Sequence, residues 1–427
     1  MSGNHFNMLL PLGFEDLVRR GCLAQEWDAF CASLDEPCPV SVHVNDCMTV
    51  DALFADNVAD VVPHCQSGYY LHSRPQFTLD PLLHVGCYYV QEANSMALSE
   101  YLAKYVPTDA VALDVCAAPG GKSIILSQHL KQHGFLVANE PIPKRANVLA
   151  ENLQKWGNDN FMVTHAFPDR LAKIKAKFDL LLVDAPCSGE GMFRKEPEAL
   201  RQWSMENVLQ CAERQKSILA DVWPLLKDGG TLIYSTCTYN HLEDEDVVDW
   251  LCNEFEARLI VMRHFYPHAD KGEGLFIAVM TKGEPAGRSE PSAEPHSYLL
   301  QSVGERKVAV QKCFANVVEE VRRCVPVIVS GTEVSVVKGN KNIPCHALAL
   351  SKYRHNILRQ NNPIGNYVTT EISEADALKY LRGETLQADG QQKGITLITH
   401  KGQALGWGNN VGNRINNLYP QQWRIRN

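Results

Sequence analysis

The segment Phe178-Asp-Leu-Leu-Leu-Val-Asp-Ala-Pro-Cys-Ser-Gly-Glu-Gly-Met-Phe-Arg-Lys195 is the most informative part of this 427-residue chain. Its apolar run, Leu180–Val183, is short enough for a buried strand of a parallel sheet. Pro186 cannot donate a hydrogen bond to a sheet ladder, so the strand must end before it. Ligands of doubly wound α/β sheets bind at the carboxyl ends of the strands, so Asp184 and Cys187 stand at the mouth of an expected active site.

A second segment, Gly230–Thr238, also reads as a short apolar strand and ends with another thiol, that of Cys237. Two strands that each deliver a cysteine at the carboxyl end of one sheet indicate chemistry that uses both thiols. Free cysteines are among the most buried residues, so two structural cysteines are the alternative when the pair is taken alone.

Composition indicates a folded globular chain of two or three domains, with 45% hydrophobic and 21% charged residues. The sequence shows no apolar run of about 18 residues and no secretory leader, so we expect a cytoplasmic protein that does not enter membranes. None of the 14 cysteines forms a C-x-x-C pair, which predicts reduced thiols and no metal site. A net charge of −8 argues against general electrostatic coating of nucleic acid, so any such contact must be local.

Four segments follow from the order of the predicted elements. Residues 1–95 read as a small α/β domain, and residues 96–282 alternate strands with helices, which predicts a parallel sheet. Residues 283–297 are rich in Pro, Ser, Gly and Glu, the composition of a linker. Residues 298–427 follow as a third region of short mixed elements.

Two details of the predicted sheet domain matter later. Residues 258–263 and 275–281 are expected to close the sheet as an antiparallel pair. The pattern Asn240-x-x-Glu243 is typical of a capping box at the start of a helix, with further acidic residues in its first turn.

The loop Cys116-Ala-Ala-Pro-Gly-Gly-Lys-Ser123 follows the first strand of this domain. A dinucleotide site requires G-x-G-x-x-G, whereas only the adjacent Gly120 and Gly121 are present. A P-loop requires a glycine where Cys116 stands, so the backbone cannot curl around a triphosphate. S-adenosylmethionine has no phosphate and needs close backbone approach, which these small residues allow. The sequence therefore favours this cofactor over a tight turn without a ligand.

Glu140 ends the second predicted strand, where a carboxylate can accept both hydroxyls of a cofactor ribose. Thiols beside such a cofactor are needed when the methyl acceptor is a weakly nucleophilic carbon. A thiolate that adds to C6 of a pyrimidine turns C5 into an enamine, and the C5 proton and the thiol leave after methyl transfer. Asp184 is placed to favour the adduct through N3. These residues alone leave open which thiol attacks.

Three motifs, Val115–Lys122, Asp184–Lys195 and Ser235–Asn240, resemble the Sun-type family of RNA cytosine-C5 methyltransferases, and most of all the small-subunit ribosomal RNA methyltransferase F group. Supporting motifs spread this resemblance over nearly the whole chain: Tyr89–Met96, His264–His268, Gly272–Gly274, Leu405–Gly408 and Tyr419–Pro420. The resemblance implies a Rossmann-like class I methyltransferase core, an N-terminal RNA-recognition domain and a C-terminal α+β RNA-binding module of PUA-like type.

The resemblance also implies a role for each site residue. Cys237 is expected to be the nucleophile, Cys187 to assist product release, and Asp184 to complete the catalytic group. The expected cofactor site consists of Cys116, Ala117, Ala118, Pro119, Gly120, Gly121, Lys122, Glu140, Arg145, Asp169 and Asp184. The family often has an acidic residue near the adenine, and Asp169 is the candidate, although Phe167-Pro168 shifts it.

The expected reaction is methylation of C5 of a cytosine in RNA, with 16S ribosomal RNA or the small ribosomal subunit as partner and a monomeric enzyme. A transfer-RNA cytosine-C5 methyltransferase and an RNA-binding ribosome-assembly factor are the alternatives. The flanking regions depart from the family at His43, where an arginine is expected, and at Asn409 and Asn416, where lysines are expected.

The tail, residues 401–427, contains four basic residues and no acidic ones. Trp407, Tyr419 and Trp423 lie between them, which predicts an RNA-contacting surface on which bases or sugars stack. The alternative is that these aromatic side chains form the small core of the last domain.

Overall fold

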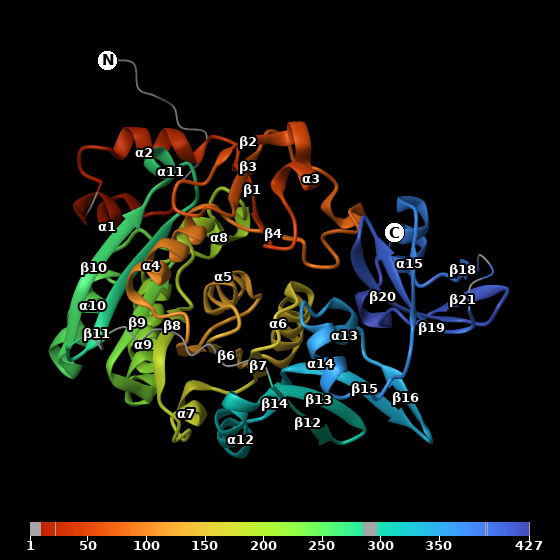
Figure 1. The fold of residues 1–427 in the computed structure, drawn as a ribbon. Coiled ribbons are helices and arrows are strands. Elements are labelled where there is room, and N and C mark those ends of the chain that lie inside the picture. Colours follow the sequence, from red (N-terminus) through yellow and green to blue (C-terminus); the bar gives the residue numbers. More distant parts are fainter. Residues whose placement is uncertain (1–9, 22, 285–296, 389, 391, 427) are drawn as a thin grey trace.

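The computed structural model describes residues 10–21, 23–284, 297–388, 390 and 392–426. Its centre is an eight-stranded sheet in the order β10-β11-β9-β8-β5-β6-β7-β14 (Figure 1). Five of these strands are parallel: β5 (Val111–Asp114), β6 (Phe135–Asn139), β7 (Phe161–Thr164), β8 (Phe178–Asp184) and β9 (Leu226–Thr236). β11 (Leu275–Lys282) and β10 (Ala257–Phe265) close one side as the predicted antiparallel pair.

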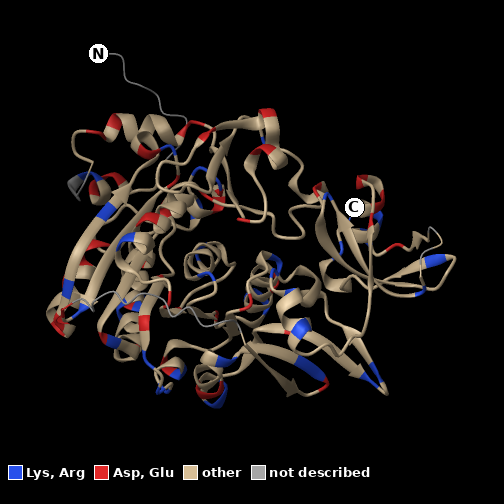
Figure 2. Ribbon diagram, viewed as in Figure 1, with Lys and Arg blue, Asp and Glu red and all other residues tan. Residues whose placement is uncertain are grey.

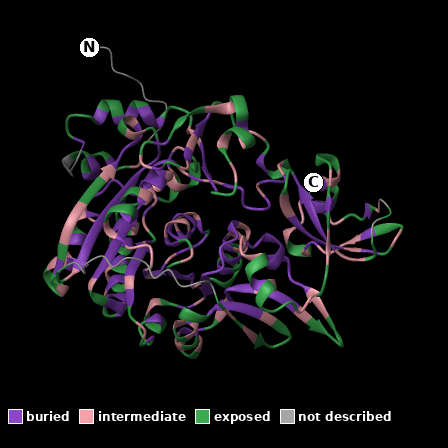
Figure 3. Ribbon diagram, viewed as in Figure 1, coloured by how far each residue is buried: buried purple, intermediate pink, exposed green. Residues whose placement is uncertain are grey.

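Helices cover both faces of this sheet, which explains why its strands read as continuous apolar runs. One face packs against α4 (Leu98–Tyr105), α5 (Gly121–Leu130) and α6 (Pro143–Trp156). The other packs against α9 (Met205–Val222), α10 (Glu245–Phe255) and α12 (Ala315–Cys324). Figure 3 shows the central strands as the most buried part of the chain. The predicted α/β class is confirmed, and the strand order reverses between β5 and β8, where ligands bind in such sheets.

The N-terminal unit contains a four-stranded antiparallel sheet and three helices. The strands, in the order β2-β3-β1-β4, are β1 (Val40–Val44), β2 (Val58–Val61), β3 (Gly68–Leu71) and β4 (Tyr88–Val90). The helices are α1 (Phe14–Gly21), α2 (Trp27–Leu34) and α3 (Val50–Phe54). Phe14 of α1 packs on Phe193 and Trp203, and Phe30 of α2 packs on Tyr239, so this unit covers the segments that follow β8 and β9.

Residues 285–296, most of the predicted linker 283–297, lie outside the described residues. Beyond them, β14 (Val327–Ser330) joins β7 as an antiparallel edge strand of the central sheet. Asp159, just before β7, accepts hydrogen bonds from the Tyr298 hydroxyl and from Gln311 Nε2, the latter at 2.9 Å. A cut at residue 298 would therefore remove a strand from the central sheet.

The remaining elements form two further sheets. The first, in the order β12-β13-β15-β16, consists of β12 (Tyr298–Val303), β13 (Arg306–Gln311), β15 (Thr332–Lys338) and β16 (Lys341–Pro344), followed by α13 (His346–Leu350) and α14 (Arg354–Gln360). The last, in the order β17-β19-β20-β21-β18, consists of β17 (Val368–Glu371), β18 (Leu386–Gln387), β19 (Gly394–His400), β20 (Gln403–Asn410) and β21 (Arg414–Asn417), with α15 (Glu374–Arg382). Short helices α7 (Pro168–Leu171), α8 (Pro197–Gln202) and α11 (Pro267–Asp270) complete the chain.

The aromatic side chains of the tail belong to the core of the last unit rather than to its surface. Trp407 is 1% exposed and its Nε1 donates to Cys345 O at 2.9 Å. Tyr419 is 3% exposed. Trp423 is half-buried against His346 and Lys155. The prediction that Trp407 and Tyr419 stack on RNA is therefore wrong, because the small core of the last domain holds both rings.

Among the described residues, no helix combines the length and the apolar character needed to cross a lipid bilayer.

Candidate active site

The two thiols meet because β8 and β9 run parallel and end at the same level. Asp184 lies opposite Ser235 in the ladder, and Ala185 N donates to Ser235 O at 2.9 Å. The pairing continues past the strands, where Gly191 N donates to Cys237 O at 2.7 Å. The Sγ atoms of Cys187 and Cys237 are consequently 3.2 Å apart.

A cavity of about 360 Å³ opens above these strand ends. Nine of the sequence-predicted site residues line it: Cys116, Ala117, Ala118, Pro119, Gly121, Lys122, Asp184, Cys187 and Cys237. A larger hollow of about 620 Å³ lies between residues 63–67 and the helices α4 and α5, but neither thiol lines it. We therefore place the candidate active site in the smaller cavity, because it alone of the two brings the glycine loop and both cysteines together.

An ion pair joins the glycine loop to the end of β8. Lys122 Nζ lies 2.9 Å from Asp184 Oδ1, which also accepts from Ser235 Oγ at 2.8 Å. Burial alone lowers the pKa of Lys122, but the Asp184 carboxylate outweighs this effect and the net pKa is raised. Lys122 thus keeps its positive charge beside both β8 and Cys237.

Glu140 and Arg145 support the glycine loop from outside the cavity lining. Arg145 Nη1 lies 3.1 Å from Glu140 Oε2, and Arg145 Nη2 donates to Ala118 O at 2.9 Å. Glu140 is 1% exposed and also accepts from Ile142 N at 3.0 Å. Gly120 has a φ of +120°, which residues with side chains rarely adopt, so the turn requires glycine there.

The structure does not bring Asp169 into the site. Asp169 is exposed in α7, is absent from the cavity lining, and lies close enough to α9 to raise the pKa of Asp221 further, in addition to the burial of that carboxyl. The exposed Phe167 and Pro168, which begins α7, take the chain away from the cavity after β7. The cavity lining therefore gives no support to the expected adenine contact of Asp169, which stays a prediction.

The cavity suits a nucleoside cofactor that requires close backbone approach. A Cβ atom at Gly121 would lie 2.8 Å from Gln91 Nε2, so the loop has no room for a side chain there. Gln91 lines the cavity, and its buried Oε1 has no hydrogen-bond partner among the described residues, which leaves an acceptor for a ligand. The sequence motif Tyr89–Met96 contains this residue, although its amide was not among the predicted site residues.

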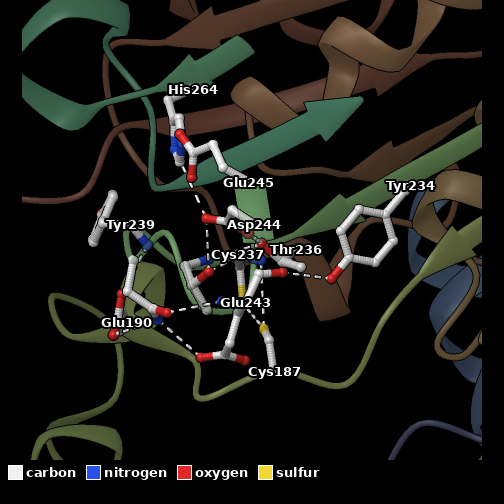
Figure 4. Close-up of polar contacts among 12 residues, drawn as sticks. Cys187, Glu190, Tyr234, Thr236, Cys237, Tyr239, Glu243, Asp244, Glu245 and His264 are labelled. Atoms are coloured by element: carbon white, nitrogen blue, oxygen red, sulfur yellow. Dashed lines mark hydrogen bonds and ion pairs between the residues drawn. The ribbon is translucent and has the colours of Figure 1, made fainter. Parts of the chain in front are cut away.

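Sequence analysis missed a group of buried carboxylates around the two thiols, drawn in Figure 4. Glu190, Glu243 and Asp244 are each 0% exposed. Asp244 accepts from Thr236 Oγ1 at 2.5 Å and from Thr238 Oγ1 at 3.0 Å, on either side of Cys237. Burial raises the pKa of Glu190 to about 7. Nothing in the sequence spacing places Glu190 beside Glu243, because the contacts between them join two separate loops.

A parallel sheet with a glycine loop after its first strand and a cavity at its switch point defines a Rossmann-like methyltransferase core. Three family descriptions match successive parts of the chain: "N-terminal domain of 16S rRNA methyltransferase RsmF" over residues 10–93, "16S rRNA methyltransferase RsmB/F" over 103–281 and "Methyltransferase RsmF PUA domain" over 367–425. The chain therefore belongs to the RsmB/F family of RNA methyltransferases. Membership in a methyltransferase family agrees with S-adenosylmethionine as the cofactor predicted from the glycine loop.

Named relatives match over almost their full length. The chain is 29% identical to the ribosomal RNA small subunit methyltransferase F of Aliivibrio fischeri strain MJ11, with 98% of each chain covered. It is also 29% identical to the protein of that name from Cronobacter sakazakii, over 97% of this chain and 96% of the relative.

Solved structures share the central fold. A methyltransferase homolog protein from Pyrococcus horikoshii is 26% identical, with a TM-score of 0.56 over 63% of this chain and 94% of its own. NSun6 from Pyrococcus horikoshii with SFG, 18% identical, has a TM-score of 0.56 over 64% of this chain and 98% of its own, which supports the fold alone.

The buried Asp114 predicts a specific pH dependence of stability. Burial raises its pKa from 3.8 to about 7, so the folded protein retains a proton that the unfolded chain has released. The free energy of unfolding should therefore fall as the pH rises from about 4 to 7. In Asp114→Asn, which cannot ionise, the thermal midpoint should fall less between pH 5.5 and pH 8 than in the wild type.

Asp228→Asn is the matched control, since this side chain is 96% exposed and should leave the wild-type pH slope unchanged. Equal slopes for Asp114→Asn and the wild type would contradict the assignment.

Proposed function

We propose that this enzyme methylates C5 of a cytosine in RNA through a covalent adduct between Cys237 and C6. The observation that supports this proposal best is the 3.2 Å separation of Cys187 and Cys237 at the cavity that the glycine loop also lines. Methylation of an amine or a hydroxyl needs no thiol, whereas methylation of C5 needs one to add and then to leave.

The proposed reaction assigns one role to each side chain. S-adenosylmethionine supplies an electrophilic methyl group. The Cys237 thiolate adds to C6 while N3 takes up a proton from solvent, and the Asp184 carboxylate stabilises the adduct by accepting a hydrogen bond from protonated N3. Once C5 has been methylated, the C5 proton is lost to a base and the Cys237–C6 bond breaks. Cys187 assists this release.

Electrostatics favours Cys187, rather than Cys237, as the thiol that assists release. Hydrogen bonding to Cys237, burial and the nearby Glu243 raise the pKa of Cys187 well above its usual value, so Cys187 stays protonated. Lys122 retains its charge and interacts with Cys237, so a cation lies beside the proposed nucleophile. A Cys187 that stays protonated suits the proposed release thiol rather than the nucleophile.

Charge distribution supports RNA as the substrate. Residues 298–427 contain 17 Lys and Arg against nine Asp and Glu, whereas residues 1–297 contain 24 against 40. Figure 2 shows Lys and Arg on β13, on the β15–β16 hairpin and on β21. We propose 16S ribosomal RNA as the target because relatives matched over 96–98% of their length are named for the small ribosomal subunit. Residues 298–427 are proposed to position this RNA.

Cells that express Cys237→Ala in place of the wild type should lose one 5-methylcytosine from 16S ribosomal RNA, as read by bisulfite sequencing of ribosomal and transfer RNA. Cys187→Ala should accumulate a denaturant-resistant RNA adduct, because release stalls after addition. Cys252→Ala, half-buried on α10 and away from the cavity, is the control and should retain wild-type methylation. A stable adduct with Cys237→Ala would contradict the nucleophile, and loss of a mark from transfer RNA instead would contradict the target.

Glu140 is proposed to hold the cofactor ribose, with Arg145 fixing its carboxylate. Loss of this charge-assisted bond in Glu140→Ala should weaken S-adenosylmethionine binding by about 1.5–3 kcal/mol, roughly ten- to a hundredfold, as measured by calorimetry. Glu151→Ala on α6 removes a carboxylate whose one ion pair among the described residues is with Lys155, and it should leave the affinity unchanged. Unchanged binding by Glu140→Ala would exclude the ribose role.

The exposed Arg414 on β21 is proposed to contact an RNA phosphate. Arg414→Ala should weaken RNA binding and reduce the slope of log affinity against log salt by about 0.7–0.9, without changing cofactor affinity. Arg258→Ala on β10 is the control, because this arginine pairs with Glu284 and lies on the edge strand of the central sheet that is farthest from β14. Filter binding at several salt concentrations measures the RNA affinity and its salt slope for each variant. Equal slopes for Arg414→Ala and Arg258→Ala would contradict the proposed phosphate contact.

A further inference from the structure

Two buried glutamates connect the loop after β8, which carries Cys187, with the loop after β9, which carries Cys237. We call these the two thiol loops. Glu190 follows Cys187 in the chain, yet its Oε2 accepts from Tyr239 N at 2.8 Å, two residues after Cys237. Glu243 follows Cys237, yet its Oε2 accepts from Ser188 N at 2.9 Å, directly after Cys187. Each thiol loop is therefore held by a carboxylate that belongs to the other loop (Figure 4).

The amide of Asn240 ties the two carboxylates together. Its Nδ2 donates to Glu190 Oε1 at 2.8 Å and to Glu243 Oε1 at 2.9 Å. We call Glu190, Asn240 and Glu243 the carboxylate clamp. The clamp has further donors on each side, because Glu190 also accepts from Trp203 Nε1 at 2.9 Å and Glu243 from Gln215 Nε2 at 2.8 Å.

The clamp replaces the capping box that the sequence predicts at Asn240-x-x-Glu243. Asn240 Oδ1 does accept from Glu243 N at 3.0 Å, which is half of that motif. The Glu243 carboxylate, however, turns to Ser188 and Gln215, and α10 begins only at Glu245. A side chain suited to capping a helix is used to bind the opposite loop instead.

Burying two carboxylates at this position costs free energy of folding. Both glutamates are 0% exposed, and no lysine or arginine of the described chain forms an ion pair with either one. Burial raises the pKa of both carboxyl groups. Buried carboxylates without a cation lower stability compared with apolar side chains, so their presence here needs a reason other than stability.

We propose that Glu190 and Glu243 are positioning residues that hold the Sγ atoms of Cys187 and Cys237 at reacting distance throughout the catalytic cycle. Neither glutamate lines the cavity, so both act through the loops rather than on the substrate. This inference rests on the proposed function: once Cys237 is bonded to C6, Cys187 assists release only if its loop moves together with that of Cys237. The crossed hydrogen bonds join the two loops into one body.

A cross-linking experiment tests the geometry without RNA. Diamide oxidises two thiols to a disulfide, taking up two electrons and two protons itself, and mass spectrometry of the full-length protein measures the Cys187–Cys237 bond. The wild type should cross-link rapidly from 3.2 Å. Glu190→Gln and Glu243→Gln each place an amide NH2 group where N–H donors now face a carboxylate, so the crossed hydrogen bonds weaken. Both variants should therefore form the disulfide about tenfold more slowly.

A kinetic experiment separates positioning from folding. Glu190→Gln should lower kcat by about ten- to a hundredfold while KM for RNA and the affinity for S-adenosylmethionine stay at wild-type values. Trp203→Phe is the matched control, because it removes the other hydrogen bond of Glu190 while leaving the clamp intact. This control should lower the thermal midpoint but keep the wild-type cross-linking rate and kcat.

Two outcomes would overturn the proposal: wild-type cross-linking by folded Glu190→Gln and Glu243→Gln, or an equal loss of kcat in Trp203→Phe. If Glu190→Gln does not fold, Glu243→Gln makes the same test from the other loop. Wild-type protein that cross-links rapidly and slows on loss of either glutamate, but methylates no cytosine, would support the clamp and refute the proposed reaction.

Discussion

The parallel register between β8 and β9 is the constraint on which the site and its surroundings depend. Because Asp184 lies opposite Ser235, β8 and β9 end at the same level of the sheet. The two loops that carry the cysteines therefore leave the sheet side by side. A slip by one residue would turn every side chain of the strand to the other face. β5 and β11 flank the pair on either side and hold this register in the middle of the sheet.

Charge burial beneath these strand ends explains why the site needs so many polar side chains. An isolated buried carboxylate costs several kcal/mol, whereas a hydrogen bond to a charged group contributes about 1.5–3 kcal/mol. Glu190 accepts three such bonds, from Trp203, Asn240 and Tyr239. Trp203 and Tyr239 also belong to the aromatic cluster under α1 and α2, so the N-terminal unit shields this network from water.

The sequence predicts the catalytic core well because its information is local. An apolar strand followed by Asp184, Pro186 and Cys187 fixes both a fold and a position within that fold, and the structure brings Cys237 beside it. The placement of the glycine loop at the cavity is predicted correctly for the same reason. Each of these predictions needs only the rule that functional side chains follow parallel strands.

The sequence-based predictions fail where segments far apart in the sequence meet in the structure. Nothing local distinguishes Glu243 as a helix cap from Glu243 as a partner of Ser188, because the deciding contact lies 55 positions away along the chain. β14 reads as part of a separate region, since no short pattern announces its pairing with β7. Trp407 shows the limit in another way: an aromatic ring between basic residues suits RNA stacking and a small core equally, and only packing decides.

The position of β14 also bears on how the protein is made. β7 leaves the ribosome roughly 160 residues before its edge partner β14, which at about 5–20 residues per second is on the order of ten seconds or more. During that interval β7 is paired with β6 on one side only, and its other edge is of the kind that recruits other chains. The central sheet is therefore complete only once residue 330 has been synthesised, well after the strands that carry both thiols.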